Sequence, residues 1–233
     1  ILAPFMDESA ILLAEGINPY DLDTIMKKYG FPVGPVTLLD EVGLDVGAHV
    51  SKDLGAAFGE RVVSADPRAV QALVETGAHG RKSQKGFFLY GPQQNKGMPL
   101  EKIKSTLGKP FGMKNRKPIN PEAMKVVNQY RIEGKHNHDP ARVQQRMALR
   151  FVNEAVLCLQ EGILFSPVEG DIGAVFGLGF PPMRGGPFRH VDSEGVSEIV
   201  RQLKNLEDEF GARYTPAQML VDMAKKGERF HPA

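Results

Sequence analysis

Cysteine and tryptophan are scarce in this sequence: among 233 residues there is one cysteine, Cys158, and no tryptophan. A single cysteine excludes an internal disulfide and favours a reducing compartment. Because Cys158 lies in the apolar run 155–159, we expect an inert thiol in the core rather than a reactive one.

Long hydrophobic runs and an excess of one charge are also lacking. No apolar run approaches the roughly 18 residues that a membrane-spanning helix needs, so no transmembrane segment is predicted. The formal net charge of +1 argues against nucleic acid as a partner and against a membrane-surface role. With 42% hydrophobic and 24% charged residues, the composition is that of a globular chain with a real core.

The motifs that bind cofactors and metals are missing as well. The string closest to the dinucleotide fingerprint G-x-G-x-x-G, residues 177–182, has proline at the third glycine and no strand before it. No P-loop, H-E-x-x-H or C-x-x-C occurs. His136 and His138 lack a distant third ligand, so an exposed loop is favoured over a metal site. His190 could act as a general acid or base, but a histidine satisfied by local hydrogen bonds is favoured.

An internal repeat organises the rest of the chain. Residues 5–10 (FMDESA) recur as 151–156 (FVNEAV), and residues 15–17 (EGI) recur as 161–163. The later matches are Asp21 with Asp171, 30–32 with 179–181, and Pro35, Asp40 and Gly43 with Pro187, Asp192 and Gly195. The spacing drifts from 146 to 152 residues, as expected for a duplicated unit with short loop insertions.

Apolar periodicity predicts helices in both copies. Residues 147, 151, 155 and 159 are apolar and form one face of a long helix that ends at Gly162. Further helices are expected at 21–29, 35–40, 45–58, 121–130, 193–210 and 216–226, and the only strand-like run is 86–90. The predicted fold is all-α, with two tandem homologous helical domains, 1–90 and 140–233, related by a pseudo-twofold axis and joined by the linker 91–139.

Two segments allow more than one interpretation. The linker carries ten basic and four acidic residues, so it could bind CoA phosphates or anionic lipid, although a solvated linker is favoured. The loop 31–35 (FPVGP) has two prolines that fix the backbone and a glycine that permits a tight turn. Such a loop can form the wall of a ligand site or simply end a helix, and its residues alone favour neither.

Several strings resemble the C-terminal domain of 3-hydroxyacyl-CoA dehydrogenases. They are PFMDE at 4–8, GFPVGP at 30–35, LLDEVGLD at 38–45 and the segment 80–90, in which Gln84 replaces the glycine usual in the family. Doubling of the domain is typical of multifunctional fatty-acid β-oxidation enzymes. The stretches 151–155 and 185–189 look most like the α subunits of mitochondrial trifunctional proteins.

The resemblance implies the helical half of an NAD-dependent (3S)-hydroxyacyl-CoA dehydrogenase, an oxidoreductase of lipid metabolism. In that family NAD and the catalytic His–Glu pair belong to a preceding Rossmann domain, so this chain would bind no cofactor, hold no catalytic residue and be inactive alone. Enoyl-CoA hydratase activity would lie elsewhere in the parent chain, and a thiolase subunit is a further expected partner. The chain opens at Ile1 in the middle of a predicted helix, without methionine or a targeting pattern, so we expect a fragment.

The resemblance also implies an acyl-CoA site. The residues expected to contact substrate are Leu2, Phe31, Pro32, Gly34, Pro35 and Leu38, with Leu2, Pro32 and Leu38 at the thioester end. The second copy would occupy the place of a partner subunit and keep only a packing role.

The alternative function is a non-catalytic structural or assembly module of a multienzyme complex. The two hypotheses differ in whether the loop 31–35 faces an open cleft or is buried against the second copy. The tail 230–233 (FHPA) lacks the peroxisomal S-K-L signal, which favours a mitochondrial location, with peroxisome and bacterial cytoplasm as alternatives.

Overall fold

The computed structural model describes residues 1–91 and 117–232, and within these ranges the fold is all-α. The α-helices are α1 (Leu2–Ala14), α2 (Pro19–Tyr29), α3 (Pro35–Val42), α4 (Leu44–Phe58), α5 (Pro67–Glu75), α7 (Pro121–Gln129), α8 (Pro140–Gln160), α9 (Pro167–Leu178), α10 (Pro187–Glu194), α11 (Val196–Phe210) and α12 (Gln218–Lys226). The short 3₁₀ helices used below are η1 (Gly59–Arg61), η4 (Pro182–Arg184) and η5 (Ala212–Tyr214). The strand-like run 86–90 forms only isolated β-bridges, because the chain turns back on itself there and pairs briefly with Ile119.

A cap followed by proline starts many of these helices. In each case a polar side chain accepts a hydrogen bond from a backbone N–H in the first turn, which would otherwise lack a partner. The following proline has no N–H to leave unsatisfied and a backbone angle suited to a helix. The capping residues are Asn18, Asp66, Asn120, Asp139 and Ser166.

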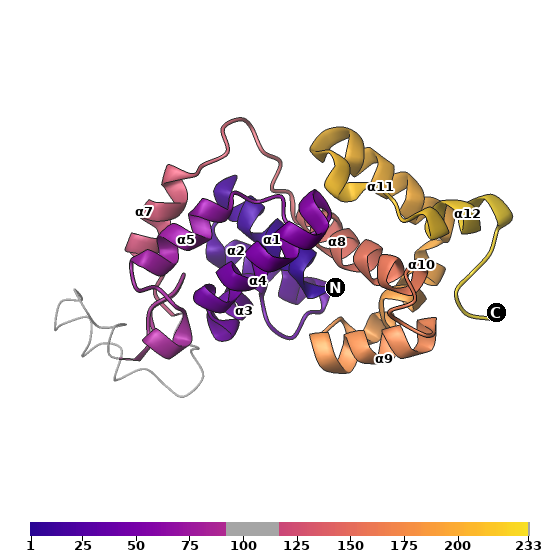
Figure 1. Cartoon of the computed structure of the whole chain (residues 1–233), viewed down its shortest axis with the longest axis horizontal. Coiled ribbons are helices and arrows are strands. Elements are labelled where there is room, and N and C mark those ends of the chain that lie inside the picture. The colour runs from indigo at the N-terminus through magenta and orange to yellow at the C-terminus, as the bar shows by residue number, and fades with distance from the viewer. Residues whose placement is uncertain (92–116, 233) are drawn as a thin grey trace.

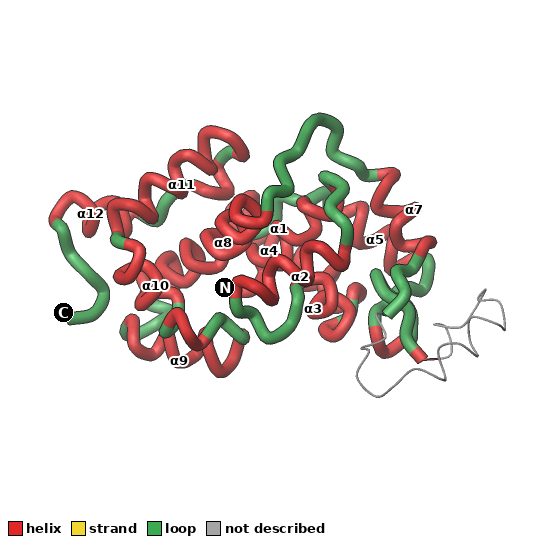
Figure 2. Tube along the Cα trace, turned by 180° about the vertical axis from the view of Figure 1, so that it is seen from behind, coloured by secondary structure: helices red, strands yellow, loops and turns green. Residues whose placement is uncertain are grey.

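The order of elements repeats along the chain, as the sequence predicted. Helices α1 to α5 of the first copy correspond to α8 to α12 of the second, and η1 corresponds to η5. Figure 1 shows the first copy at one end, the second at the other, and α1 packed along α8 between them. In Figure 2 the loop from α7 to α8 arches over the first copy and joins the two.

A buried aspartate in each copy fixes the angle between two helices. Asp23 on α2 accepts the N–H of Val36 at 2.8 Å, and Asp171 on α9 accepts the N–H of Phe188 at 2.8 Å. Each carboxylate thus accepts hydrogen bonds from N–H groups at the start of the next helix that would otherwise lack a partner. The counterpart of Asp171 is therefore Asp23, and the match with Asp21 was wrong: Asp21 is exposed and lies on the outer side of α2.

A second aspartate in each copy holds the segment that follows its last helix. Asp40 accepts the N–H groups of residues 87 and 88 at 2.8 and 2.9 Å. Asp192, at the same place in the second copy, accepts those of residues 230 and 231, both at 2.9 Å. These bonds tie the end of each copy back onto its third helix.

Four phenylalanines form the apolar centre between the copies. Phe5 stacks on Phe31 with ring centroids 4.9 Å apart, and Phe151 lies 5.1 Å from Phe180. Across the interface, Phe5 meets Phe151 at 6.1 Å and Phe31 meets Phe180 at 5.9 Å, both edge to face. All four are buried, so this cluster places the pseudo-twofold axis in the core.

Two ion pairs across the interface are related by the same pseudo-symmetry, and others have no symmetric counterpart. Arg61 of the first copy pairs with Glu154 at 2.9 Å, and Arg213 of the second copy pairs with Glu8 at 3.2 Å. Arg146 on α8 adds a further pair: its guanidinium lies 2.6 Å from the Glu8 carboxylate. Only 1% of the Arg146 side chain is exposed.

Arg146 also binds Glu15, at the other end of α1. Both terminal nitrogens of the guanidinium donate to the Glu15 carboxylate at 2.8 Å, a bidentate geometry. Burial, the largest single effect, raises the pKa of Glu15, but the hydrogen bonds and the charge of Arg146, with smaller effects of His136 and His138, together outweigh it and lower that pKa. A lowered pKa in the folded state means that Glu15 stabilises the fold at neutral pH and loses this contribution as the pH falls through the folded pKa.

Replacing Arg146 by methionine should therefore be costly. We expect Arg146→Met to lower the free energy of unfolding by about 3–5 kcal/mol at pH 7, because the buried Glu15 loses its bidentate partner and the buried Glu8 keeps only Arg213. Urea denaturation measures this. The control is Arg201→Met, whose partner Glu198 is exposed and whose loss should change little. Equal changes in the two variants would show that the Arg146 pair contributes no more than a surface pair.

Gln84 has an unusual backbone conformation. Its φ of 60° and ψ of 12° are left-handed, and it is the one non-glycine residue with positive φ in the described ranges. The turn nevertheless forms, since Gly80 and Lys85 exchange backbone hydrogen bonds at 2.9 and 3.1 Å. The departure from the family's glycine thus leaves the turn in place but introduces backbone strain.

Gln84→Gly should relieve that strain. We expect the free energy of unfolding to rise by about 0.5–1 kcal/mol, because the left-handed conformation costs a side-chain-bearing residue more than glycine loses in chain entropy. Thermal and urea unfolding test this against Gln84→Ala, which keeps the strained backbone and should give no gain. A less stable glycine variant would contradict the expectation.

Candidate functional site

An apolar cleft opens in the first copy between α1, α3, α4 and the start of α5. Its volume is about 190 Å³. The side chains of Leu2 and Met6 on α1 form one wall, and Leu39 closes it from α3. The remaining apolar lining is Val42, Leu44, Val46, Val50, Val63, Pro67 and Val70. We call this the first-copy cleft.

The exposed wall of the first-copy cleft is a stripe of valines. Val42, Val46 and Val50 recur at four-residue spacing, and each is 43–46% exposed although its side chain is fully apolar. The buried Leu44 anchors the start of α4, which leaves the valines at the surface. Such a surface suits an acyl chain or another apolar wall rather than a charged ligand.

One buried carboxylate lies beside this cleft. Asp7 accepts the N–H groups of Ser64 and Ala65 at 3.0 and 2.9 Å, which fixes the loop that follows η1. Burial raises the pKa of Asp7, although these hydrogen bonds and Arg150 oppose the shift. Because its oxygens are engaged by the backbone, Asp7 shapes the wall and is not a free general base.

A second cleft, with a volume of about 360 Å³, lies between α8, α10 and α11 of the second copy and Tyr29 of the first, and it overlaps in part the place that corresponds to the first-copy cleft; we call it the second-copy cleft. The positions of Val42, Val46 and Val50 are taken there by Glu194, Glu198 and Gln202. Both Glu194 and Gln202 line the second-copy cleft, together with Arg142 and Gln145. Two clefts built from one repeated unit thus differ in polarity, and only the first is apolar.

His190 stands in the second-copy cleft at the place of Leu38. Its Nε2 lies 3.1 Å from the hydroxyl of Tyr29, and Arg184 stacks over the Tyr29 ring at 3.8 Å. Burial, with a smaller effect of Arg184, lowers the pKa of His190, while burial raises the pKa of Tyr29 to about 12. Both groups are therefore neutral near pH 7, as expected for a histidine satisfied by a local hydrogen bond.

The residues expected to contact substrate separate into two groups. Leu2 lines the first-copy cleft. Leu38 is half-buried and is not part of its lining, whereas the next residue, Leu39, is. The structure thus brings Leu2 together with the α3–α4 valines rather than with the loop 31–35.

That loop divides between the core and the surface. Phe31 is buried against the second copy, and Gly34 and Pro35 are buried at the start of α3. A Cβ added to Gly34 would lie 2.3 Å from the Asp23 carboxylate, so this glycine is required for the hydrogen bonds that Asp23 makes. Pro32 is exposed. The loop is therefore buried against the second copy at Phe31 and exposed at Pro32, so each of the two hypotheses for the loop is met by one of its residues.

The valine stripe was missed by reasoning from the sequence. Its signal was nevertheless present, because aligning 42–50 with 194–202 shows three apolar positions replaced by polar ones. A difference between two copies of one unit points to a difference in what each copy contacts.

The remaining candidates from the sequence are the histidine pair, the cysteine and the basic linker. His136 and His138 are partly buried and approach the Glu15 carboxylate at 3.9 and 3.4 Å. Within 1–91 and 117–232, no group of three His, Cys, Asp or Glu side chains is placed to hold a metal. Cys158 is buried, and burial raises the pKa of its thiol. Most of the basic linker, residues 92–116, lies outside the described residues.

The described residues do not fit NAD. A dinucleotide needs a glycine-rich turn between a strand and a helix, and no sheet exists in the part of the chain that the structure describes. We therefore assign no chemical step to a cofactor held by these residues.

None of the helices in the described part of the chain is long and apolar enough to cross a bilayer.

Comparison with protein families decides the affiliation of the chain. The family model described as "3-hydroxyacyl-CoA dehydrogenase, C-terminal domain" matches residues 1–90 and again 143–230. The chain belongs to this family. Each matched segment contains one of the two copies, so the unit that recurs within this chain is the dehydrogenase C-terminal domain.

Comparison with individual proteins gives matches that are consistent with this family. The chain is 42% identical over 231 residues to the fatty acid oxidation complex subunit alpha of Shewanella loihica; the match covers 99% of this chain and 29% of that protein. The dehydrogenase part of multifunctional enzyme 1 from C. elegans is 25% identical with a TM-score of 0.65, over 95% of this chain and 46% of that one. The 3-hydroxybutyryl-CoA dehydrogenase of Escherichia coli shares the fold, with a TM-score of 0.68 at 21% identity, over 96% of this chain and 58% of that one.

Proposed function

We propose that this dehydrogenase C-terminal domain pair is the substrate-binding and dimerisation-like half of an NAD-dependent (3S)-hydroxyacyl-CoA dehydrogenase in fatty-acid β-oxidation. The observation that carries the proposal is the first-copy cleft, which is apolar where its duplicate is polar. A wall of valines and leucines favours the acyl part of hydroxyacyl-CoA, since burial of apolar surface contributes roughly 25 cal/mol per Å².

In this proposal the chain binds and orients but does not itself transfer hydride. Hydride transfer needs donor and acceptor within about 3–3.5 Å, so a second wall must hold NAD and the catalytic base. NAD held by that wall would supply the hydride acceptor for the carbon that bears the 3-hydroxyl group. The first-copy cleft would exclude water from the acyl end and limit how the substrate can lie.

The loop 31–35 and Leu38 remain candidate contacts in this proposal. The open side of the loop at Pro32 supports a contact with substrate, and the packed side at Phe31 supports a role in holding the second copy. A purely structural role is less well supported for the chain as a whole, because the family model and the relatives that it matches are dehydrogenases.

The proposal also covers the other domains, the partner subunit and the source of the parent protein. The relative from Shewanella loihica is a subunit of a complex, which supports a further subunit, and we propose a thiolase. The chain spans about 29% of that relative, which leaves room in the parent chain for the Rossmann domain and an enoyl-CoA hydratase. Because this relative is bacterial, we place the parent in a bacterium, with a mitochondrial protein as the alternative.

Val46→Glu in the parent enzyme tests the cleft. It installs the residue of the second copy, and we expect kcat/KM for hydroxyacyl-CoA to fall at least about tenfold, because a charge would be buried against an acyl chain. The affinity for NAD should not change. The matched control, Glu198→Val, makes the reverse exchange at the equivalent position and should leave kinetics unaltered. Unchanged kinetics in a folded Val46→Glu enzyme would remove the cleft from the substrate site.

The 233-residue chain by itself should neither bind NAD nor turn over substrate. Calorimetry with NAD and with acetoacetyl-CoA, and an absorbance assay that follows NADH, test this directly. We expect no heat with NAD and at most weak binding of the acyl-CoA, since one wall of the site is missing. Measurable turnover would show that the chemistry lies in these helices after all.

A further inference from the structure

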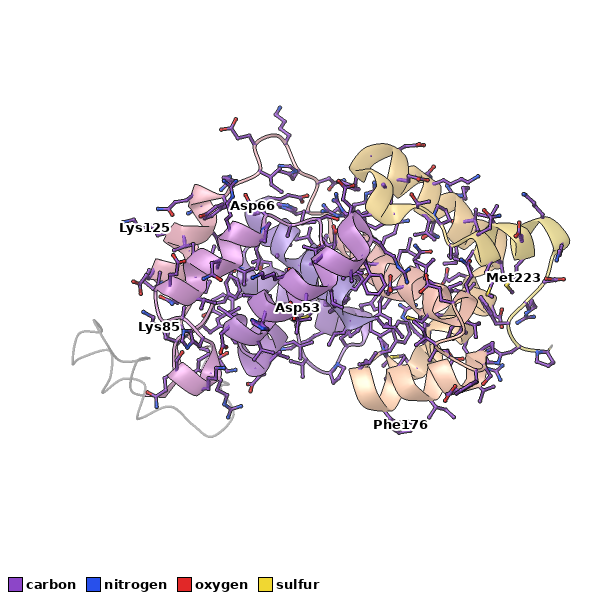
Figure 3. The ribbon with its side chains drawn as sticks, in the orientation of Figure 1. Asp53, Asp66, Lys85, Lys125, Phe176 and Met223 are labelled. Atoms are coloured by element: carbon purple, nitrogen blue, oxygen red, sulfur yellow. The ribbon has the colours of Figure 1, made fainter. Side chains whose placement is uncertain are left out.

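The outer face of α9 is the most apolar surface of the second copy. Phe165 and Phe176 are 89% and 86% exposed, and Val168 and Ile172 share the same face at 53% and 55%. Figure 3 shows Phe176 projecting from α9 away from the rest of the molecule. The one charged side chain among them, Glu169, is occupied by the backbone N–H of Phe165 at 2.9 Å.

The duplicate helix α2 does not share this character. Its residues at the positions of Val168, Ile172 and Phe176 are Tyr20, Thr24 and Lys28. Thr24 and Lys28 are exposed and solvated, as on an ordinary helix surface. The apolar face of α9 is therefore not a property of the repeated unit, and exposed apolar patches of this kind mark contact surfaces.

The neighbouring side of α9 is formed by two glycines. Gly173 and Gly177 stand where α2 has Ile25 and Tyr29, and a Cβ added to either glycine would meet nothing within 4 Å. In α2 this side is covered: Ile25 is buried, and its carbonyl accepts a hydrogen bond from the Gln144 side chain at 2.9 Å. The cover is supplied by the first turns of α8.

The pseudo-twofold axis indicates which segment would cover α9. Helix α8 begins at Pro140, eight residues before Ala148, which is the counterpart of Leu2 on α1. Those eight residues include Gln144, whose side chain bonds to the Ile25 carbonyl of α2. Since the chain spans 29% of its curated relative, most of such a polypeptide lies outside these residues.

We propose that α9 is the docking surface for the segment that precedes Ile1 in the parent chain. In this arrangement α1 continues for about two further turns, which lie over Gly173 and Gly177. The glycines let the two helix backbones approach closely, and the polypeptide leading into these turns covers Ile172 and Phe176. The proposal rests on the proposed function only in taking this chain as part of the longer dehydrogenase.

The experiment compares the parent chain with the 233-residue chain by hydrogen–deuterium exchange. We expect the amides of α9 to exchange at least tenfold more slowly in the parent. The double variant Ile172→Thr with Phe176→Lys, which installs the residues of α2, should restore fast exchange in the parent. The control, Ile132→Thr, changes an exposed apolar residue far from α9 in the sequence and should have no effect on α9.

Three results would overturn the proposal. The first is equally fast exchange of α9 in both chains. The second is a concentration-dependent dimer of the parent that the double variant abolishes, which would make a second copy the occupant. The third is binding of the parent to phosphatidylglycerol vesicles that the double variant abolishes. Failure of the proposed function has a different signature, because it would appear as unaltered kinetics of Val46→Glu while α9 stayed protected.

Discussion

The buried guanidinium of Arg146 is the constraint on which the relation of the two copies depends. It belongs to the second copy, yet both of its carboxylate partners belong to the first, Glu8 on α1 and Glu15 at the C-terminal cap of that helix. A charge this deeply buried is tolerated only with its partners in place, so it fixes the register of α8 along α1. The four-phenylalanine centre then has one way to pack, and the two clefts take their positions from it.

Within each copy, two aspartates hold equivalent elements together. The carboxylates of Asp23 and Asp171 hold the third helix against the second, and those of Asp40 and Asp192 bring the end of the copy back. These polar contacts recur in both copies, whereas the residues at the cleft mouths do not. The buried hydrogen bonds of the duplicated scaffold are thus the same in both copies, whereas the residues at the mouths of the two clefts differ.

The sequence was enough to predict the repeat, the all-α fold and most helix positions, because these follow from periodicity and proline caps. The match of Asp21 with Asp171 failed because spacing alone was used. Helix phase would have selected Asp23, which shares the buried face with Leu22 and Met26. The role of Arg146 could not be read in this way, since it depends on how the two copies meet in space. The valines at 42, 46 and 50 could have been found by aligning 42–50 with 194–202, but periodicity within one copy does not single them out.

Linking the two copies in one polypeptide has a consequence for how each can change. In a dimer of identical subunits both clefts carry the same residues, and dilution separates them. Here the tether through α7 keeps the copies at a high effective concentration, whatever the amount of protein in the cell. One cleft can therefore become polar while the other stays apolar, and the two different copies remain associated at any protein concentration.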